Sequence, residues 1–233
     1  MTLRSWDTNA ANWTRAVREG LIASRKAGTD EAVVQAILRR RPRRLLDVGC
    51  GEGWLVRRVT RLAGCVAVGV DGSAALIEAA RAADPTNRYC HLTYDQLVGG
   101  ERLIGAGADQ DADAGFDVIV FNYALFDETA AALLAAMRSR LTPDGAVVIQ
   151  TLHPWALSGG ADYRDGWRSE NFAAFEGSTL KDDWAPMPWF FRTLESWHGV
   201  VREAGLSLIE LREPAAAPGE TPLSLLLTCG AEP

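Results

Sequence analysis

The chain has 233 residues, which is enough for one domain with a full core and a small insertion but short for two independent domains. Hydrophobic residues make up 48% of it and charged residues 23%, as in ordinary globular proteins, and no apolar run approaches the length of a membrane span. The net charge of −6 argues against a nucleic-acid binder, because such proteins usually carry a basic stripe.

Several further features limit the class of protein. The first residues are polar and lack the apolar core of a signal peptide, so we expect a cytoplasmic protein with no membrane partner. The single basic cluster, at 39–44, is typical of a solvated helix end. The four cysteines are far apart and show no Cys-x-x-Cys spacing, so we expect neither a disulfide framework nor a metal site.

The predicted elements alternate between strands and helices. Residues 1–40 contain two amphipathic helical stretches before the first strand. Strands are then predicted at 45–48, 65–70, 88–93, 116–121 and 146–151, with helices at about 53–62, 74–83 and 128–141. Ser73 is placed to cap the second of these helices, and 143–145 (Pro-Asp-Gly) predicts a turn. This alternation implies a parallel sheet with right-handed crossovers.

Two segments break the alternation. Residues 105–115 form a small-residue, acidic stretch that we expect to be a loop without function. Residues 152–191 are rich in Trp, Pro and Gly without a clear period, and irregular segments of this length are usually lids or binding loops.

The chain closes with a predicted helix at 192–204, ended by Gly205, and strands at 206–212 and 223–229. The linker between the two strands is too short for a crossover helix, so they should pair antiparallel.

These elements predict one α/β domain in four parts. The sheet is Rossmann-like and mostly parallel, with seven strands, helices on both faces and an insertion after the fifth strand. The parts are an N-terminal helical cap (1–42), a cofactor-binding core (43–151), a substrate lid (152–191) and a C-terminal helix with the antiparallel strand pair (192–233).

A glycine loop follows the first strand directly. Gly49-Cys50-Gly51-Glu52-Gly53 lets the backbone turn tightly and approach a ligand at the carboxyl end of the strand, where open α/β sheets bind cofactors. A dinucleotide fingerprint would need Gly or Ala at position 54, which is Trp, and no Gly-Lys-Ser or Gly-Lys-Thr phosphate loop is present. The loop therefore indicates a ligand without a pyrophosphate.

Two acids flank this loop. Asp47 stands one residue before the end of the first strand, where a carboxylate suits a cation or an amine. Asp71 ends the second strand, where an acid can accept hydrogen bonds from both hydroxyls of a ribose.

Three motifs lie at these strand ends: Leu-Leu-Asp-Val-Gly-Cys-Gly-Glu-Gly (45–53), Val-Gly-Val-Asp-Gly-Ser (68–73) and Phe-Asp-Val-Ile-Val-Phe-Asn-Tyr-Ala-Leu (116–125). Together they resemble the motifs of class I S-adenosylmethionine-dependent methyltransferases. The resemblance covers roughly 43–151, and the closing strand pair is also like that fold. It implies S-adenosylmethionine as cofactor and S-adenosylhomocysteine as product.

The resemblance also assigns roles to residues. Gly49, Cys50 and Gly51 would pass the methionine part of the cofactor, with Asp47 near its amino group and Asp71 on the ribose hydroxyls. Gly72, Ser73, Thr93 and Tyr94 would surround the adenine, and Asn122 and Tyr123 would face the sulfonium. Many relatives have an acid where Thr93 stands, so Asp95 is an alternative contact to the adenine.

His153 is the candidate catalytic residue. It follows the fifth strand directly, at the substrate side of such a fold, and an ordinary histidine pKa near 6.5 suits a general base. The alternative is that His153 anchors the lid by a hydrogen bond.

The acceptor should bind under the tryptophan-rich segment. Aromatic and arginine residues alternate there and suit an apolar or aromatic substrate with an anionic group, although the same aromatics would also suit a satellite core. Candidate substrate residues are Trp13, Arg18, Trp155, Tyr163, Arg168 and Trp189. Arg18 and Arg25 are candidates to meet a carboxylate, or else lie on a solvated helix face.

The predicted function is methyl transfer to a small molecule, at oxygen or nitrogen. The segments around Trp13, His153 and Trp189 resemble bacterial small-molecule methyltransferases without an assigned substrate. Two alternatives remain: a non-catalytic S-adenosylmethionine-binding regulator, and a methyltransferase acting on protein or RNA. The residues after the fourth strand, Asn-Tyr-Ala-Leu, lack the Asn-Pro-Pro-Tyr signature of planar-amine methylation.

Overall fold

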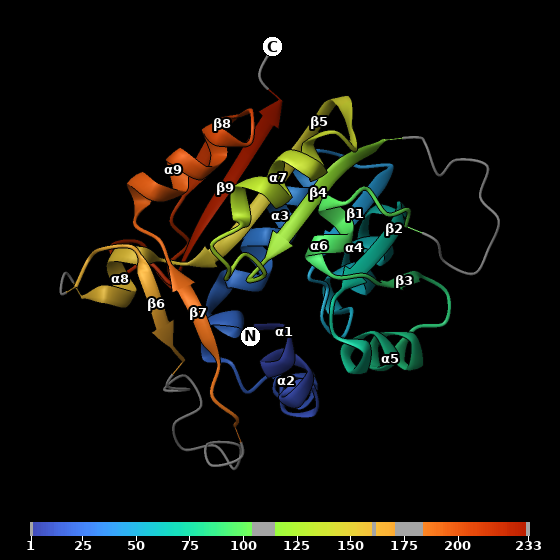
Figure 1. Ribbon diagram of the computed structural model, residues 1–233, viewed down its shortest axis with the longest axis horizontal. Coiled ribbons are helices and arrows are strands. Elements are labelled where there is room, and N and C mark those ends of the chain that lie inside the picture. The colour runs from blue at the N-terminus through green and yellow to red at the C-terminus, as the bar shows by residue number, and fades with distance from the viewer. Residues whose placement is uncertain (1, 104–114, 160–161, 171–183, 232–233) are drawn as a thin grey trace.

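The computed structural model describes residues 2–103, 115–159, 162–170 and 184–231 (Figure 1). The helices are α1 (Thr2–Thr8), α2 (Ala10–Arg18), the π-helical turn η1 (Arg25–Thr29), α3 (Asp30–Arg39), α4 (Trp54–Ala63), α5 (Ala74–Ala83), α6 (Tyr94–Val98), α7 (Ala130–Arg138), α8 (Pro154–Ser158) and α9 (Leu194–Glu203). The strands are β1 (Arg44–Val48), β2 (Val66–Asp71), β3 (Arg88–His91), β4 (Phe116–Asn122), β5 (Leu141–Leu152), β6 (Gly166–Ser169), β7 (Pro188–Phe191), β8 (Leu206–Arg212) and β9 (Ser224–Ala231).

Seven strands form one sheet in the order β3-β2-β1-β4-β5-β9-β8. The pairs from β3 to β5 are parallel, whereas β9 pairs antiparallel with both β5 and β8. The order reverses between β1 and β4, so the carboxyl ends of these two strands border the crevice in which open α/β sheets bind ligands. The predicted Rossmann-like fold, with its antiparallel C-terminal pair, is confirmed.

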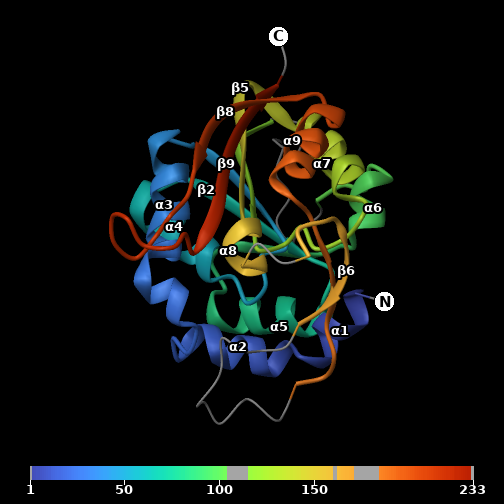
Figure 2. The ribbon, with the colours of Figure 1, turned by 90° about the vertical axis from the view of Figure 1, so that its left-hand side faces the viewer.

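Helices cover both faces of the sheet (Figure 2). Alternate β4 residues serve the two cores: Val118 and Val120 pack with α3, α4 and α5, and Ile119 and Phe121 pack with α6, α7 and α9. This two-sided burial explains why the central strands are continuous apolar runs in the sequence.

The predicted helices have the correct positions, with ends fixed by their caps. Ser73 caps α5 as predicted, because its hydroxyl accepts a hydrogen bond from the Leu76 amide at 3.3 Å. The last helix begins at Leu194 rather than 192, since the Thr193 hydroxyl accepts from the Ser196 amide and so defines the N-cap. The helix predicted at 128–141 is shorter, as α7 ends at Arg138.

The predicted turn at 143–145 is wrong. These residues belong to β5, at the point where its register with β4 shifts between Phe116 and Val118. A Cβ on Gly145 would lie 2.8 Å from the Phe116 carbonyl oxygen. The glycine therefore permits close approach of two strands at an irregular pairing, not a chain reversal.

The insertion after β5 has more regular structure than its sequence predicts. It contains α8 and a separate two-stranded antiparallel sheet of β6 and β7. Most of the acidic stretch at 105–115 lies outside the described residues.

The N-terminal helices contact both α5 and the insertion. Helices α1 and α2 lie against α5, and α1 also contacts β7 (Figures 1 and 2). The buried Asn9 side chain makes two hydrogen bonds to the Ala185 backbone, at 2.9 and 3.0 Å. The N-terminal helices and the insertion after β5 thus lie against each other.

Candidate functional site

The glycine loop has a backbone that only glycines adopt readily. Gly49, Gly51 and Gly53 have φ angles of +77°, +56° and +83°. A Cβ on Gly49 would lie 2.5 Å from the Ala124 Cβ, whereas one on Gly51 would meet no atom within 4 Å. Gly49 therefore allows the loops after β1 and β4 to touch, and Gly51 presents its backbone to open space.

Asp71 holds the loop in place from the end of β2. One carboxylate oxygen accepts a hydrogen bond from the Gly51 amide at 2.9 Å, and the other accepts from the Ser73 amide at 2.8 Å. Burial raises the pKa of Asp71, while these two amides oppose that effect. The carboxylate is positioned by backbone amides and retains lone pairs for hydroxyl donors.

Asp47 is the most unusual residue of the site. Its side chain is 1% exposed, and its Oδ1 atom has no hydrogen-bond partner among the described residues. Burial, followed by the negative charge of Asp71, raises the pKa of Asp47 to about 8. A buried carboxyl group without a partner is costly, and a cationic ligand beside it would remove that cost.

Cys50, Gly72 and Ser73, which the sequence predicts as cofactor contacts, differ in which of their atoms are accessible from this site. The Cys50 thiol is buried towards Gly69, so only the Cys50 backbone faces the loop. Leu3 of α1 lies against Gly72, and the Ser73 hydroxyl donates a hydrogen bond to Asp7. The adenine side predicted from the sequence is therefore bordered by α1.

The loop after β3 forms a further wall. Thr93 and Gln96 make a capping box at the start of α6, and Asp95 is exposed. The Tyr94 hydroxyl donates to the Ala124 carbonyl at 2.9 Å and lies at 3.0 Å from a Cβ placed on Gly49. Tyr94 therefore joins this wall to the glycine loop, and Thr93 serves as the N-cap of α6.

A buried polar cluster lies at the ends of β4 and β5. The Gln150 amide donates to Asn122 Oδ1 at 3.1 Å and to the Thr29 carbonyl at 3.0 Å. Tyr123 has a φ of +53°, a conformation that non-glycine residues adopt mainly where surrounding structure enforces it. Its hydroxyl is near Thr29 and Ser224, and burial raises the pKa of Tyr123 to about 12.

Both ring nitrogens of His153 are engaged. The side chain is 3% exposed, its Nδ1 accepts a hydrogen bond from the Ala156 amide at 3.2 Å, and its Nε2 lies 2.8 Å from Glu213 Oε1. An Nδ1 that accepts requires Nε2 to carry the proton. This geometry favours the anchoring alternative, because neither nitrogen is free to take a proton from a substrate.

The predicted substrate residues Trp13 and Trp189 belong to one aromatic cluster. Trp13 stacks on Trp6 at 5.4 Å between centroids, and Trp6 lies 6.2 Å from Phe126. Phe126 in turn meets Trp189 edge-on at 5.9 Å, and Trp184 meets Trp13 at 4.9 Å. The cluster joins α1 and α2 to the loop after β4 and to β7, beside the sheet's crevice.

The other predicted substrate residues of the insertion form a second group. Trp155 is 56% exposed and meets Tyr163 edge-on at 5.7 Å. The Tyr163 hydroxyl accepts from the Leu194 amide at 2.9 Å, and the Arg168 guanidinium lies 3.4 Å from the Phe191 ring centroid. Phe191 joins this group to the aromatic cluster, because its ring centroid lies 6.0 Å from that of Tyr163 and 6.0 Å from that of Trp189.

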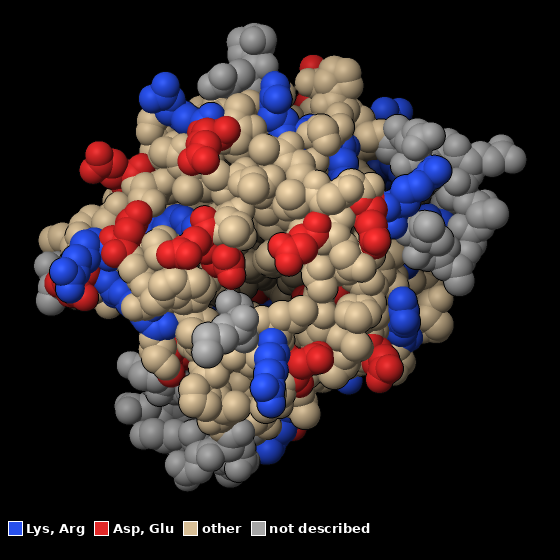
Figure 3. Space-filling view, viewed as in Figure 1, with Lys and Arg blue, Asp and Glu red and all other residues tan. Residues whose placement is uncertain are grey.

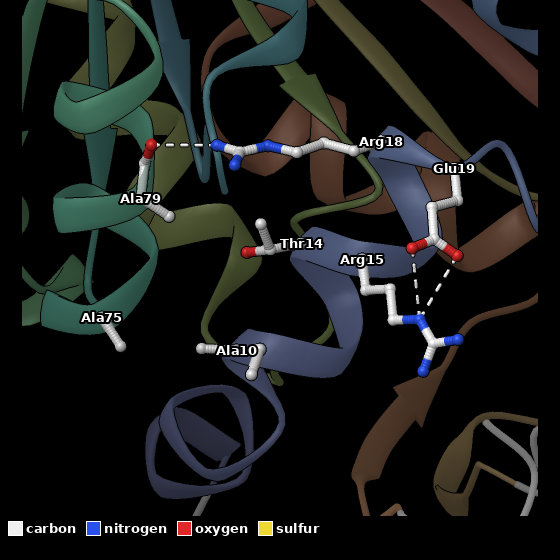
Figure 4. A pocket seen from close by; sticks show the side chains of 8 residues that line it. Ala10, Thr14, Arg15, Arg18, Glu19, Ala75 and Ala79 are labelled. Atoms are coloured by element: carbon white, nitrogen blue, oxygen red, sulfur yellow. Dashed lines mark hydrogen bonds and ion pairs between the residues drawn. The ribbon is translucent and has the colours of Figure 1, made fainter.

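Arg18 extends from α2 towards Ala79 of α5 (Figure 4). Its Nε lies 2.9 Å from the buried Glu52 carboxylate and its Nη2 donates to the Ala79 carbonyl at 3.0 Å, across a groove of about 470 Å³ between α2 and α5. Arg57 also pairs with Glu52, at 2.8 Å. Arg25 pairs with Asp30 at 2.8 Å, so both arginines have protein carboxylates as partners.

Three residues near the site are not predicted as site residues, because no local sequence pattern marks them. Glu52 lies inside the glycine motif, but its partner comes from α2. Phe126 and Arg192 become notable only through contacts between distant segments. Among the described residues, no group of three or more His, Cys, Asp or Glu side chains is arranged to hold a metal ion.

Comparisons with known proteins place this chain in a family. Residues 23–211 match the model of the methyltransferase domain family, so the chain belongs to that family. This confirms the resemblance to class I S-adenosylmethionine-dependent methyltransferases and the prediction of S-adenosylmethionine as cofactor. No curated protein matches the chain.

Solved structures share the fold at low identity. A TehB-like S-adenosylmethionine-dependent methyltransferase from Corynebacterium glutamicum is 20% identical, with a TM-score of 0.60 over 96% of this chain and 98% of that one. The Burkholderia thailandensis 1,6-didemethyltoxoflavin N1-methyltransferase, bound to its substrate and S-adenosylhomocysteine, is 16% identical, with a TM-score of 0.58 over 97% and 88%. The partner of the Haloferax volcanii methyltransferase activator Trm112 is 15% identical, with a TM-score of 0.65 over 100% and 98%.

Proposed function

We propose that this methyltransferase transfers the methyl group of S-adenosylmethionine to an oxygen or nitrogen of a small molecule. The observation that carries the cofactor site is the buried, unpartnered Oδ1 of Asp47, next to the open backbone of Gly51. The cofactor's amino group is a cation that fits this carboxylate. When bound, the cofactor supplies a methyl group already activated by a sulfonium charge.

The chain's own residues would hold and orient this donor. Asp71 would accept hydrogen bonds from the ribose hydroxyls while its position stays fixed by the Gly51 and Ser73 amides. Asn122 and Tyr123 would border the sulfonium from the end of β4. Alignment of donor and acceptor is the main demand of an in-line displacement, and such alignment can contribute about 7–11 kcal/mol.

The aromatic cluster supports a small, flat acceptor. Trp13, Trp6, Phe126 and Trp189 pack ring against ring between the N-terminal helices, the loop after β4 and β7, and aromatic rings favour planar ligands through stacking. The 1,6-didemethyltoxoflavin methyltransferase, whose fold this chain shares, binds a substrate of that size class.

The distribution of surface charge supports a small-molecule substrate rather than a nucleic acid. Basic and acidic side chains are interspersed over the face seen in Figure 3, without a broad basic area of the kind that binds nucleic acids. Among the described residues, no helix combines the length and apolarity that crossing a membrane requires. We propose that the four sequence segments act as one domain in the cytoplasm, and that His153 anchors α8.

Replacing Asp71 by asparagine tests the cofactor site. Asp71→Asn should weaken S-adenosylhomocysteine binding by about 10- to 100-fold in calorimetry, because hydrogen bonds to a charged group contribute about 1.5–3 kcal/mol. The exposed Asp144→Asn is the matched control and should bind normally. Equal affinities in all three proteins would refute this site.

Transfer itself needs a separate measurement. Incubation with methyl-labelled S-adenosylmethionine and a cell metabolite extract should give a labelled small molecule with the wild type and much less with Asp71→Asn. Label found in protein or RNA instead would refute the small-molecule acceptor. Binding without any transfer would identify a regulator.

A further inference from the structure

Arg192 has an unusual position next to the insertion. It follows β7 and is 3% exposed, and its Nη1 atom has no hydrogen-bond partner among the described residues. Its Nη2 donates to the Asp127 carbonyl, and its guanidinium lies 4.8 Å from the Phe190 ring centroid and 5.3 Å from that of Trp197. These contacts fix the guanidinium but leave one of its nitrogens unused.

Arg192 borders a small cavity at the carboxyl ends of β4 and β5. The cavity measures about 10 Å³, roughly the space of one water molecule. Apart from Arg192 and Thr151, the residues that line it are apolar, and they come from the loop after β4, the end of β5, α8, β7 and α9. One of them, Phe126, also belongs to the aromatic cluster.

Other groups near Arg192 already have partners of their own. The Asp165 carboxylate accepts from the Thr193 amide at 2.8 Å, and the Tyr163 hydroxyl accepts from the Leu194 amide at 2.9 Å. The first amides of α9 are therefore not available to a ligand. The negative charges of Asp165, Asp127 and Glu128 act on Arg192, but none of the ion pairs among the described residues includes Arg192.

A buried guanidinium without a carboxylate partner costs free energy, and proteins keep such groups where a ligand completes the pair. Arginine offers parallel N–H donors that match the two oxygens of a carboxylate. A cavity lined by apolar side chains and one arginine guanidinium suits a ligand that has an apolar body and one carboxylate.

We propose that Arg192 binds the carboxylate of the methyl acceptor, which is thus a small aromatic or apolar acid. This inference rests on the proposed function and specifies its substrate class. The carboxylate would lie at the unpartnered Nη1, and the half-buried Trp189 and Phe190 would shift to admit the acid. The planar carboxylate fits the narrow cavity better than a tetrahedral phosphate.

The test compares simple probes on protein saturated with S-adenosylhomocysteine. Calorimetry is carried out with benzoate, its neutral isostere benzamide, and phenyl phosphate. Benzoate should bind about 10- to 100-fold more tightly than benzamide, as expected for hydrogen bonds to a charged group. Absence of benzoate binding, equal binding of the amide, or tighter binding of phenyl phosphate would each overturn the proposal.

Variants then assign this preference to one arginine. Arg192→Met should remove the difference between benzoate and benzamide, whereas Arg192→Lys should keep part of it because the charge remains. Arg202→Met, at an exposed position in the last turn of α9, is the matched control and should keep the preference for benzoate. A preference for benzoate that survives in Arg192→Met would overturn the proposal.

Two further measurements separate the possible failures. S-adenosylhomocysteine affinity and the urea midpoint are determined for every variant. If the wild type does not bind S-adenosylhomocysteine, the proposed function fails; if it binds but benzoate does not, only the carboxylate assignment fails. Arg192→Lys serves as the test variant if Arg192→Met does not fold.

Discussion

Replacing Asp47 by asparagine should change how the stability of the protein depends on pH. The folded protein raises the pKa of Asp47 from an ordinary 3.8 to about 8, mainly by burial. Between these values the folded state holds a proton that the unfolded state has lost. The resulting stabilisation is complete below about pH 4 and disappears as pH rises to about 8.

The expected magnitude follows from linkage. Each pH unit inside the window should lower the free energy of unfolding of the wild type by about 1.4 kcal/mol, to a total of roughly 6 kcal/mol. Asparagine carries no proton to lose, so Asp47→Asn should lack this contribution. Relative to the wild type, the variant should therefore gain stability as pH rises.

Urea unfolding of the cofactor-free proteins at pH 5, 6, 7 and 8 measures this effect. The slope against pH is the readout, because a constant difference between the proteins would reflect only the altered packing. Asp144→Asn, at an exposed position of the same sheet, should follow the wild-type slope. Parallel curves for the wild type and Asp47→Asn would refute the reasoning about a protonated, buried carboxyl group.

Substitutions at Gly49 and His153 test two individual contacts. Gly49→Ala should destabilise the protein by about 1–3 kcal/mol more than Gly64→Ala in urea unfolding, because both have positive φ but only the Cβ at position 49 meets another atom, at 2.5 Å; equal effects would contradict the close approach of the two loops. His153→Ala should lower stability by about 1–2 kcal/mol through the lost N-cap, and His153→Asn should restore most of it and keep turnover. Loss of turnover in His153→Asn at normal stability would instead assign His153 to catalysis.

The sequence predicts well whatever depends on local pattern. Strand ends, the glycine loop and the acids at 47 and 71 are recognisable because each requires residue types within a few positions of one another. Their convergence follows from the topology, since the carboxyl ends of parallel neighbouring strands meet at one edge of the sheet. The cofactor half of the site is therefore largely predictable.

The acceptor half depends on contacts between distant segments. Trp6 and Phe126 are brought together by packing that no local period describes, and the unused Nη1 of Arg192 depends on how β7, α8 and α9 meet. The Pro-Asp-Gly segment at 143–145 has the composition of a turn, but it lies inside β5, at an irregularity where its residues have no partner in β4. Tertiary contacts override local preference in each of these cases.

The contact of α1 with Gly72 and Ser73 has a practical consequence for producing this protein. Leu3 and Asp7 contact Gly72 and Ser73 beside the predicted adenine site, so α1 would be a neighbour of the cofactor in the proposed complex. An affinity tag fused before these residues would extend from that helix. Since β9 runs to the opposite end of the molecule in Figure 1, a C-terminal tag is the better choice for every binding measurement described above.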